Sequence, residues 1–155
     1  MTPSRYARIT VAIDGSPNAE EALSAAVDLA AHYRSDLTIL TVAPLVPVYL
    51  PSATPYVAPM AHAETKQYRA LIDAAVQHAK DSGVSTVTGV CLEGVVVDEI
   101  LSFLEQHPSD VVVVGSRGLS ATKRLLIGSV SSALVTHAPC PVLVIRGGMP
   151  TKPAG

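Results

Sequence analysis

The chain of 155 residues has no tryptophan, one phenylalanine and two cysteines, and charged residues make up 15% of it. With so few aromatic side chains, a hydrophobic core must be built from aliphatic residues, and hydrophobic residues as a class reach 48%. This composition excludes a disordered chain and favours layered α/β architectures, whose buried strands are rich in valine, leucine and isoleucine. The length is enough for one domain with a sizeable core.

Two cysteines, Cys91 and Cys140, cannot form a disulfide framework. Each lies beside apolar residues, so we expect buried free thiols, with a redox pair as the less favoured alternative. No hydrophobic run approaches the about 20 residues of a membrane-spanning helix, and the apolar run at residues 9–13 is too short for a secretory signal. We therefore expect a cytoplasmic protein with no membrane partner.

Acidic residues are absent from the C-terminal part of the chain. All 13 lie in residues 1–110, together with 6 of the 11 basic residues, whereas residues 111–155 carry the other 5 basic residues and no acid. A local positive field favours a small anion. It is too sparse, and too poor in aromatic side chains, to predict a nucleic-acid partner.

Strand-like and helix-like patterns alternate along the chain. Runs of β-branched and aliphatic residues predict strands at 8–14, 37–43, 84–92, 111–114 and 142–145. Apolar residues at helical spacing predict helices at 17–33, at 61–82, from after Gly94 to about 106, and from 129 to about 137. Ser16 and Pro17 suit the N-cap and first position of the first helix. This alternation predicts an α/β fold, with a parallel sheet covered by helices on both faces.

Residues 110–132, DVVVVGSRGLSATKRLLIGSVSS, combine a buried strand, three glycines and the start of a helix. Two residues separate Gly115 from Gly118, and nine separate Gly118 from Gly128. Glycine permits positive φ and close approach of a ligand to the main chain, and a helix N-terminus supplies unsatisfied N–H donors. Hydroxyls and basic side chains add further donors: Ser116, Arg117, Lys123, Arg124, Ser129, Ser131 and Ser132. The segment suits a polyphosphate; the alternative is a glycine-containing loop with a solvated basic edge.

The spacing G-x2-G-x9-G-[ST] after a hydrophobic strand resembles the nucleotide-binding signature of the universal stress protein family, in its ATP-binding branch. Gly115, Gly118, Gly128 and Ser129 match the signature at each position. The resemblance covers nearly the whole chain. It implies an open five-stranded parallel sheet of strand order 3-2-1-4-5, a Rossmann-like fold similar to that of the adenine nucleotide alpha hydrolases.

In that order the first and fourth strands are neighbours, and the direction of connection reverses between them. Ligands of open α/β sheets bind at the carboxyl ends of the strands beside such a switch point. Asp14 ends the first strand and Gly115 the fourth, so both are expected in one crevice. With Val42 presenting its backbone to adenine, the resemblance implies nucleotide binding by Ala12, Ile13, Asp14, Val42, Gly115, Ser116, Arg117, Gly118, Gly128, Ser129, Val130 and Ser131.

Asp14 has two interpretations. It caps the next helix, or its carboxylate contacts a ribose hydroxyl or a metal on the phosphates, which the resemblance favours. We expect ATP, ADP or AMP as the ligand, with Mg²⁺ or Mn²⁺ bridging the phosphates and held chiefly by ligand and water. Gly118→Val is expected to weaken ATP binding by about 1–3 kcal/mol, through strain at a positive φ and lost backbone approach, with folding nearly intact.

The sequence has no Walker P-loop, Rossmann fingerprint or nucleophile elbow, and its histidines are dispersed, at His32, His62, His78, His107 and His137. It offers binding groups without an evident general base or nucleophile. We expect a nucleotide-dependent regulatory or stress-response protein and not an enzyme, with slow ATP hydrolysis or autophosphorylation left open. The alternative is a dimeric interaction module with a vestigial nucleotide site. The resemblance implies a homodimer through the last strand, Val142, Leu143, Val144 and Ile145; a further protein partner is not identified.

Five prolines lie between Pro44 and Pro59, together with Tyr49 and Tyr56. This composition excludes a helix and predicts an irregular loop, either mobile or a partial cover over the ligand. We expect a single domain at residues 1–146, with the proline-rich loop at 44–60 and a flexible tail at 147–155.

Overall fold

The computed structural model describes residues 4–48, 56–58, 62–118 and 127–147. The five predicted strands and four predicted helices are present, and their ends differ from the predicted ones by at most two residues. In chain order they are β1 (Arg8–Ala12), α1 (Pro17–Tyr33), β2 (Asp36–Pro44), β3 (Val46–Val48), β4 (Tyr56–Ala58), α2 (His62–Asp81), β5 (Thr86–Gly94), α3 (Val96–Gln106), β6 (Val111–Gly115), α4 (Ser129–His137) and β7 (Val142–Ile145).

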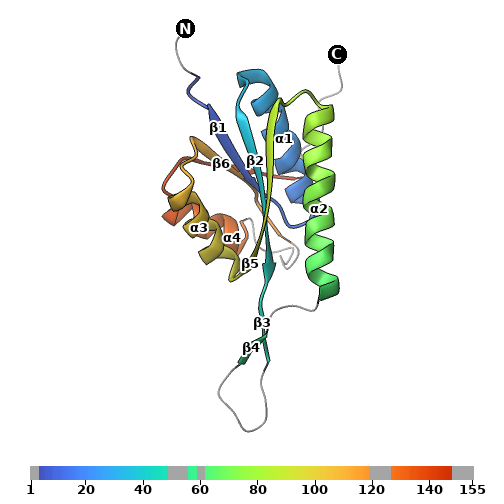
Figure 1. Ribbon diagram of the computed structural model, residues 1–155. Helices are drawn as coiled ribbons and strands as arrows, with labels where there is room; N and C mark the ends of the chain where they lie inside the picture. The colour runs from blue at the N-terminus through green and yellow to red at the C-terminus, as the bar shows by residue number, and fades with distance from the viewer. Residues whose placement is uncertain (1–3, 49–55, 59–61, 119–126, 148–155) are drawn as a thin grey trace.

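A five-stranded parallel sheet in the order β5-β2-β1-β6-β7 forms the centre of the molecule (Figure 1). Numbered by the five predicted strands, this is the order 3-2-1-4-5, which confirms the predicted topology. Central strand β1 pairs with β2 on one side and β6 on the other, so that Ala12 lies opposite both Leu40 and Val114. The carboxyl ends of β1 and β6 are therefore neighbours at the switch point.

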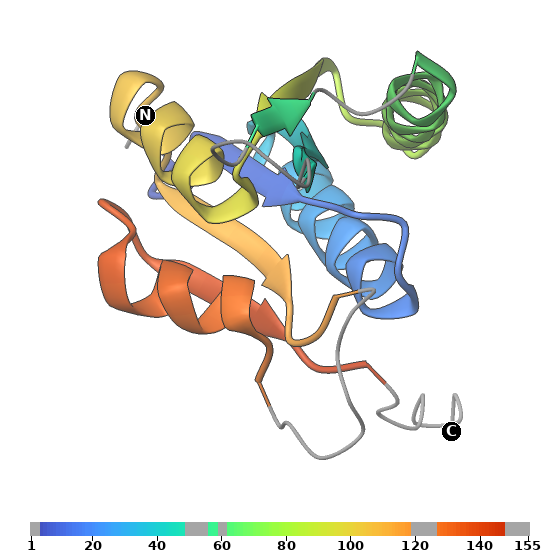
Figure 2. The ribbon, with the colours of Figure 1, turned by 90° about the horizontal axis from the view of Figure 1, so that it is seen from below.

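Helices cover both faces of the sheet, α1 and α2 on one and α3 and α4 on the other (Figure 2). Because successive strand residues point to opposite faces, each strand contributes to two cores. Ile9 and Ile39 belong to the core under α1 and α2, and Leu40 and Val112 to the core under α3 and α4. Both cores are aliphatic, as the scarcity of aromatic residues predicts.

The turn between β1 and α1 has the predicted chemistry. Gly15 adopts a φ of 84°, which glycine tolerates without strain. Ser16 is the N-cap: its Oγ accepts a 3.2 Å hydrogen bond from the N–H of Ala19, and Pro17 follows at the first helical position.

The prediction of an irregular loop at residues 44–60 is wrong for the described part of that segment. β3 and β4 form an antiparallel hairpin, with Val46 opposite Ala58 and Val48 opposite Tyr56, that projects from the end of β2 (Figure 1). Proline is tolerated here because, among the described strands, β3 pairs with β4 on one side only. On its other side the strand makes no backbone hydrogen bonds to a described neighbouring strand, so the missing N–H of a proline there costs nothing. The rest of the predicted loop, and residues 148–155 of the predicted tail, lie outside the described residues.

Cys91 and Cys140 are free, as predicted. Both are half-buried, whereas the prediction is that they are buried. Cys91 lies in edge strand β5, and Cys140 lies in the connection between α4 and β7. Burial raises the pKa of both thiols. None of the helices in the described ranges is long and apolar enough to cross a bilayer.

Candidate functional site

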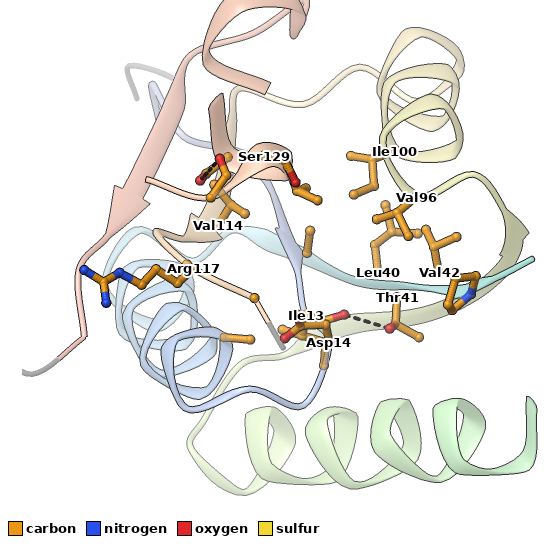
Figure 3. A pocket seen from close by; sticks show the side chains of 18 of the residues that line it. Ile13, Asp14, Leu40, Thr41, Val42, Val96, Ile100, Val114, Arg117 and Ser129 are labelled. Carbon is orange, nitrogen blue, oxygen red and sulfur yellow. Dashed lines mark hydrogen bonds between the residues drawn. The ribbon is translucent and has the colours of Figure 1, made fainter. Parts of the chain in front are cut away.

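A cavity of about 390 Å³ opens at the carboxyl edge of the sheet, over the ends of β1, β2 and β6 (Figure 3). The adjoining turns, the starts of α3 and α4, and one residue each of α1 (Ala19) and α2 (Tyr68) complete its walls. The cavity brings together eleven of the twelve residues predicted to bind a nucleotide: Ala12, Ile13, Asp14, Val42, Gly115, Arg117, Gly118, Gly128, Ser129, Val130 and Ser131.

Ser116 is the exception, because it is buried and does not line the cavity. Its N–H donates to the carbonyl of Ile145 at 2.8 Å. Its own carbonyl accepts from the N–H of Gly128 at 2.6 Å and from the Ser131 hydroxyl at 3.1 Å. Ser116 therefore holds the two ends of the glycine segment together and does not have the predicted place in the cavity wall.

Glycine is required at positions 115 and 118 because other atoms of the protein lie where a Cβ would be. A Cβ on Gly115 would lie 2.8 Å from the backbone carbon and oxygen of Asn18, and a Cβ on Gly118 would lie 2.6 Å from Oδ2 of Asp14. In the described part of the chain, the glycines with positive φ are Gly15, Gly83 and Gly94. The expectation of positive φ at Gly118 is therefore wrong; the absent side chain leaves room for the Asp14 carboxylate.

Asp14 combines both roles considered for it. Its Oδ1 accepts a 2.9 Å hydrogen bond from the N–H of Ser16, at the start of α1, while Oδ2 lies beside Gly118 at the cavity. Ser16 Oγ in turn donates to the carbonyl of Arg117 over 3.5 Å. These contacts fix the β1–α1 turn against the glycine segment and hold the carboxylate at the cavity.

The N-terminus of α4 forms another part of the wall. Gly128 is its N-cap, with no side chain bonded to the cap, and the first turn contains no acid. The first intrahelical bond runs from Ser132 N–H to the Gly128 carbonyl at 3.0 Å. The N–H groups of residues 129–131 precede it, so they lack helical acceptors and, with the positive end of the helix dipole, form an anion-binding site.

The opposite end of the cavity is apolar, and the sequence did not predict most of it. Leu40, Val42, Val96 and Ile100 gather there, whereas Ser129 and Arg117 lie at the other end and Asp14 lies between them (Figure 3). The i, i+4 spacing of Val96 and Ile100 puts them on one side of α3, but Val97 and Leu101 have the same spacing, so this signal alone does not identify the pair that lines the cavity. Further lining residues outside the prediction are Ala19, Thr41, Pro44, Tyr68 and Val114.

Ionisable groups are few in the described lining: Asp14, Tyr68 and Arg117. The Arg117 side chain extends away from Asp14 (Figure 3). Among the residues that the structure describes, no three or more His, Cys, Asp or Glu side chains form a group that could hold a metal ion. Lys123 and Arg124 lie outside the described ranges. The four histidines with described side chains, His32, His78, His107 and His137, are exposed and do not line the cavity.

The sequence model of the universal stress protein family matches residues 5–146. The chain belongs to this family. Universal stress protein YxiE of Bacillus subtilis is 33% identical over 148 residues, which cover 91% of this chain and 99% of the relative.

Two solved structures share the fold of this family member. Universal stress protein UspA from Lactobacillus plantarum superposes with a TM-score of 0.68 at 30% identity, covering 92% of this chain and 99% of its own. A universal stress protein solved in complex with cAMP superposes with a TM-score of 0.67 at 25% identity, covering 92% and 98%. The resemblance inferred from the glycine spacing is thereby confirmed at the level of family and fold.

Proposed function

We propose that this protein binds an adenine nucleotide in the cavity and acts as a nucleotide-dependent regulatory protein. The observation that carries the proposal is the separation of the cavity into an apolar end, an anion-binding end and a carboxylate between them. A nucleotide has the same three parts in the same order: a flat base, a sugar with hydroxyl donors, and phosphates.

The apolar end suits the base. Val42, Val96 and Ile100 come from β2 and α3 and form its surface, and burying such surface contributes about 25 cal/mol per Å². Ligand sites are commonly of this kind, with apolar walls and a few placed polar groups. The universal stress protein that superposes over 92% of this chain was solved with cAMP, an adenine nucleotide, which supports this choice of base.

The anion-binding end suits the phosphates. Gly118 leaves room for the Asp14 carboxylate beside the cavity, and the N–H groups of residues 129–131 supply donors for phosphate oxygens. Asp14 is then placed to accept a hydrogen bond from a ribose hydroxyl. ATP, ADP and AMP all contain these parts.

We propose that a divalent cation, if it binds, is carried by the phosphates of a di- or triphosphate. Asp14 is the carboxylate among the described lining residues, so the described lining offers one carboxylate group to a cation. Mg²⁺ commonly binds in this way, through one or two carboxylates, water and substrate phosphates. Asp14 would then orient either the sugar or the hydrated cation.

Regulation, and not catalysis, is the role that these groups favour. Asp14 is bonded to the N–H of Ser16, and the other ionisable side chains of the described lining are Tyr68 and Arg117. This set orients and binds a nucleotide, whereas hydrolysis also needs a group that positions or deprotonates water. Slow hydrolysis remains the second outcome that a phosphate-release assay would detect.

A homodimer through β7 is the second element of the proposal. β7 lies at one edge of the sheet, and its four residues, Val142–Ile145, are apolar, with Leu143 37% exposed. The opposite edge strand, β5, carries the exposed residues Thr86, Thr88 and Glu93. An uncharged edge with open backbone groups is the one suited to pair with a second copy.

Titration calorimetry with ATP, ADP, AMP and cAMP, each with and without Mg²⁺, tests nucleotide binding. Val96→Gln should weaken binding at least about tenfold, since it places an amide against the base. Val97→Gln is the matched control, because Val97 is also half-buried but does not line the cavity. Absence of binding for all four nucleotides, or equal losses in both variants, would contradict the proposal.

A further inference from the structure

Ser116 joins the cavity to the edge strand β7 through its main chain. On one side its N–H donates to the carbonyl of Ile145, the last residue of β7, at 2.8 Å. On the other side its carbonyl accepts from Gly128 N–H at 2.6 Å and from the Ser131 hydroxyl at 3.1 Å. Gly128 and Ser131 line the anion-binding end of the cavity, so a single residue connects that end to β7.

The hydrogen bonds of Ser116 are buried, so restraining one of them is expected to restrain the other. Ser116 is 4% exposed and Ser131 is 2% exposed, so water does not compete easily for these hydrogen bonds. The Ser131 hydroxyl also lies 3.1 Å from the Gly128 carbonyl, which ties the first turn of α4 to the same point. The two peptide groups that flank the Ser116 Cα share its φ and ψ, so fixing the carbonyl also restrains the N–H.

β7 depends strongly on this bond because it is short. Its four residues pair with β6 and with no other strand in the described ranges, and Ile145 lies opposite Gly115 at the end of that pairing. The Ser116–Ile145 bond is therefore the last backbone hydrogen bond that holds β7 to the chain of β6. A strand that pairs on one side has its other backbone edge open, and the order of that edge determines how much entropy a partner strand must remove.

We propose that nucleotide binding and the pairing of β7 with β7 of a second copy are thermodynamically coupled through Ser116, each favouring the other. This rests on the proposed nucleotide site. A phosphate at the start of α4 orders residues 128–131, which holds the Ser116 carbonyl and keeps its N–H on Ile145. The ordered β7 edge then loses less conformational entropy on pairing, and linkage requires that pairing strengthen nucleotide binding in return. Since each copy has one site, the factor by which nucleotide tightens the dimer is the square of the factor by which pairing strengthens binding at each site.

Hydrogen–deuterium exchange on the whole protein, at fixed concentration with and without saturating AMP, tests the local part of this coupling. Amides of residues 112–118 and 142–146 should exchange at least about fivefold more slowly with AMP, the lower end of typical coupling. Amides of β5, at the opposite edge of the same sheet, are the internal control and should keep their rates. Slowing of β5 and β7 alike, or of neither while AMP binds, would overturn the proposal.

Sedimentation equilibrium tests the coupling itself. AMP should lower the dissociation constant of the homodimer about five- to tenfold. Leu143→Lys places a charge on the exposed edge and should abolish the dimer. Its AMP affinity should fall by the square root of the factor by which AMP tightens the wild-type dimer, about two- to threefold, because each dimer binds two AMP molecules. Val135→Lys is the matched control, because Val135 is 58% exposed on α4 and lies outside both β7 and the cavity lining. Val135→Lys should change neither the dissociation constant of the dimer nor that of AMP.

The outcomes separate this inference from the proposed function. If the wild-type protein binds none of the nucleotides, the proposed function fails, and the coupling fails with it. If it binds AMP while Leu143→Lys disrupts the dimer without changing AMP affinity, the nucleotide site stands and the coupling through Ser116 is refuted. A wild-type protein that stays monomeric at all concentrations with AMP bound refutes the second copy as the partner of β7.

Discussion

Gly118→Ala is a sharp test of the site because the structure identifies one atom that the new methyl group would meet. The added Cβ would lie 2.6 Å from Asp14 Oδ2, whereas ordinary contacts begin near 3.4 Å. The carboxylate must therefore retreat by about 0.8 Å. Because Oδ1 of the same group is bonded to Ser16 N–H at 2.9 Å, it cannot retreat without stretching or losing that bond.

The expected magnitude follows from what Asp14 loses. A hydrogen bond to a charged group contributes about 1.5–3 kcal/mol, and the displaced carboxylate would lose the one that we propose it accepts from the ribose. We expect AMP or ATP binding to weaken by about 1–3 kcal/mol, which is about 5- to 150-fold in the dissociation constant. The free energy of unfolding should fall by less than about 1 kcal/mol, since Asp14 is half-buried.

Calorimetry on matched variants measures this effect. Gly128→Ala is the control: its Cβ would lie 3.3 Å from the Ser116 carbonyl oxygen, and its φ of −73° is accessible to alanine. We expect the dissociation constant of the nucleotide to change by at most about threefold in Gly128→Ala, although the family signature has glycine at both 118 and 128. In an Asp14→Ala background, Gly118→Ala should cost almost nothing further, because the atoms it collides with are gone.

Two results would refute the reasoning. Wild-type affinity in a folded Gly118→Ala protein would mean that the position of Asp14 is irrelevant to the ligand. Additive losses for Asp14→Ala and Gly118→Ala would mean that the methyl group acts through something other than the carboxylate.

Three further predictions concern stability, measured by urea unfolding. Gly115→Ala should cost about 1–3 kcal/mol, because its Cβ would meet the Asn18 backbone at 2.8 Å; an unchanged midpoint would contradict this. Gly89→Val should cost a similar amount, because its Cβ would meet the Ile72 and Val76 side chains of α2 at 2.5 and 2.8 Å; a wild-type midpoint would be evidence against this packing. The Arg8 side chain lowers the pKa of Asp110. This stabilisation is present above the unfolded pKa and lost as pH falls through the folded one, so Arg8→Ala should cost up to about 0.5 kcal/mol at pH 7 and almost nothing near pH 2; a pH-independent difference would refute it.

The part of the fold that could be predicted from the sequence is the part set by local pattern. The four valines of β6 and the aliphatic run of β1 indicate strands buried on both faces, and the glycine spacing indicates where β6 must end. The meeting of Asp14 and Gly115 in one crevice followed from the strand order that the family resemblance implies, and the pairing of β1 with β6 confirms it.

The apolar end of the cavity could not be predicted because it depends on how α3 is rotated about its axis. Three consecutive valines, Val95, Val96 and Val97, begin this region, and the sequence pattern favours an inward face that includes Val97. The structure directs Val96 to the cavity and leaves Val95 61% exposed. Successive helical residues differ by about 100°, so a local pattern with apolar residues at all three positions does not determine which one faces the ligand.

The role of Ser116 was missed for a different reason. Its contribution comes from its N–H and carbonyl, which every residue except proline possesses, so no side-chain pattern in the sequence marks it.

The hairpin of β3 and β4 was not predicted because the prolines of this segment argue against regular structure. That argument does not hold for Pro47, because it lies in a strand that pairs on one side only among the described strands.

The position of Asp14 on the central strand has a consequence for ligand size. The apolar end lies over β2, the anion-binding end lies over β6, and β1 lies between them. Since neighbouring strands are about 4.8 Å apart, a ligand that contacts both ends must span about 10 Å. Adenine alone reaches one end and inorganic phosphate the other, whereas AMP connects the two, so its binding should benefit from the effective concentration that the ribose provides. We therefore expect AMP to bind at least about 100-fold more tightly than either fragment, and a comparable affinity for adenine in calorimetry would show that the anion-binding end contributes nothing.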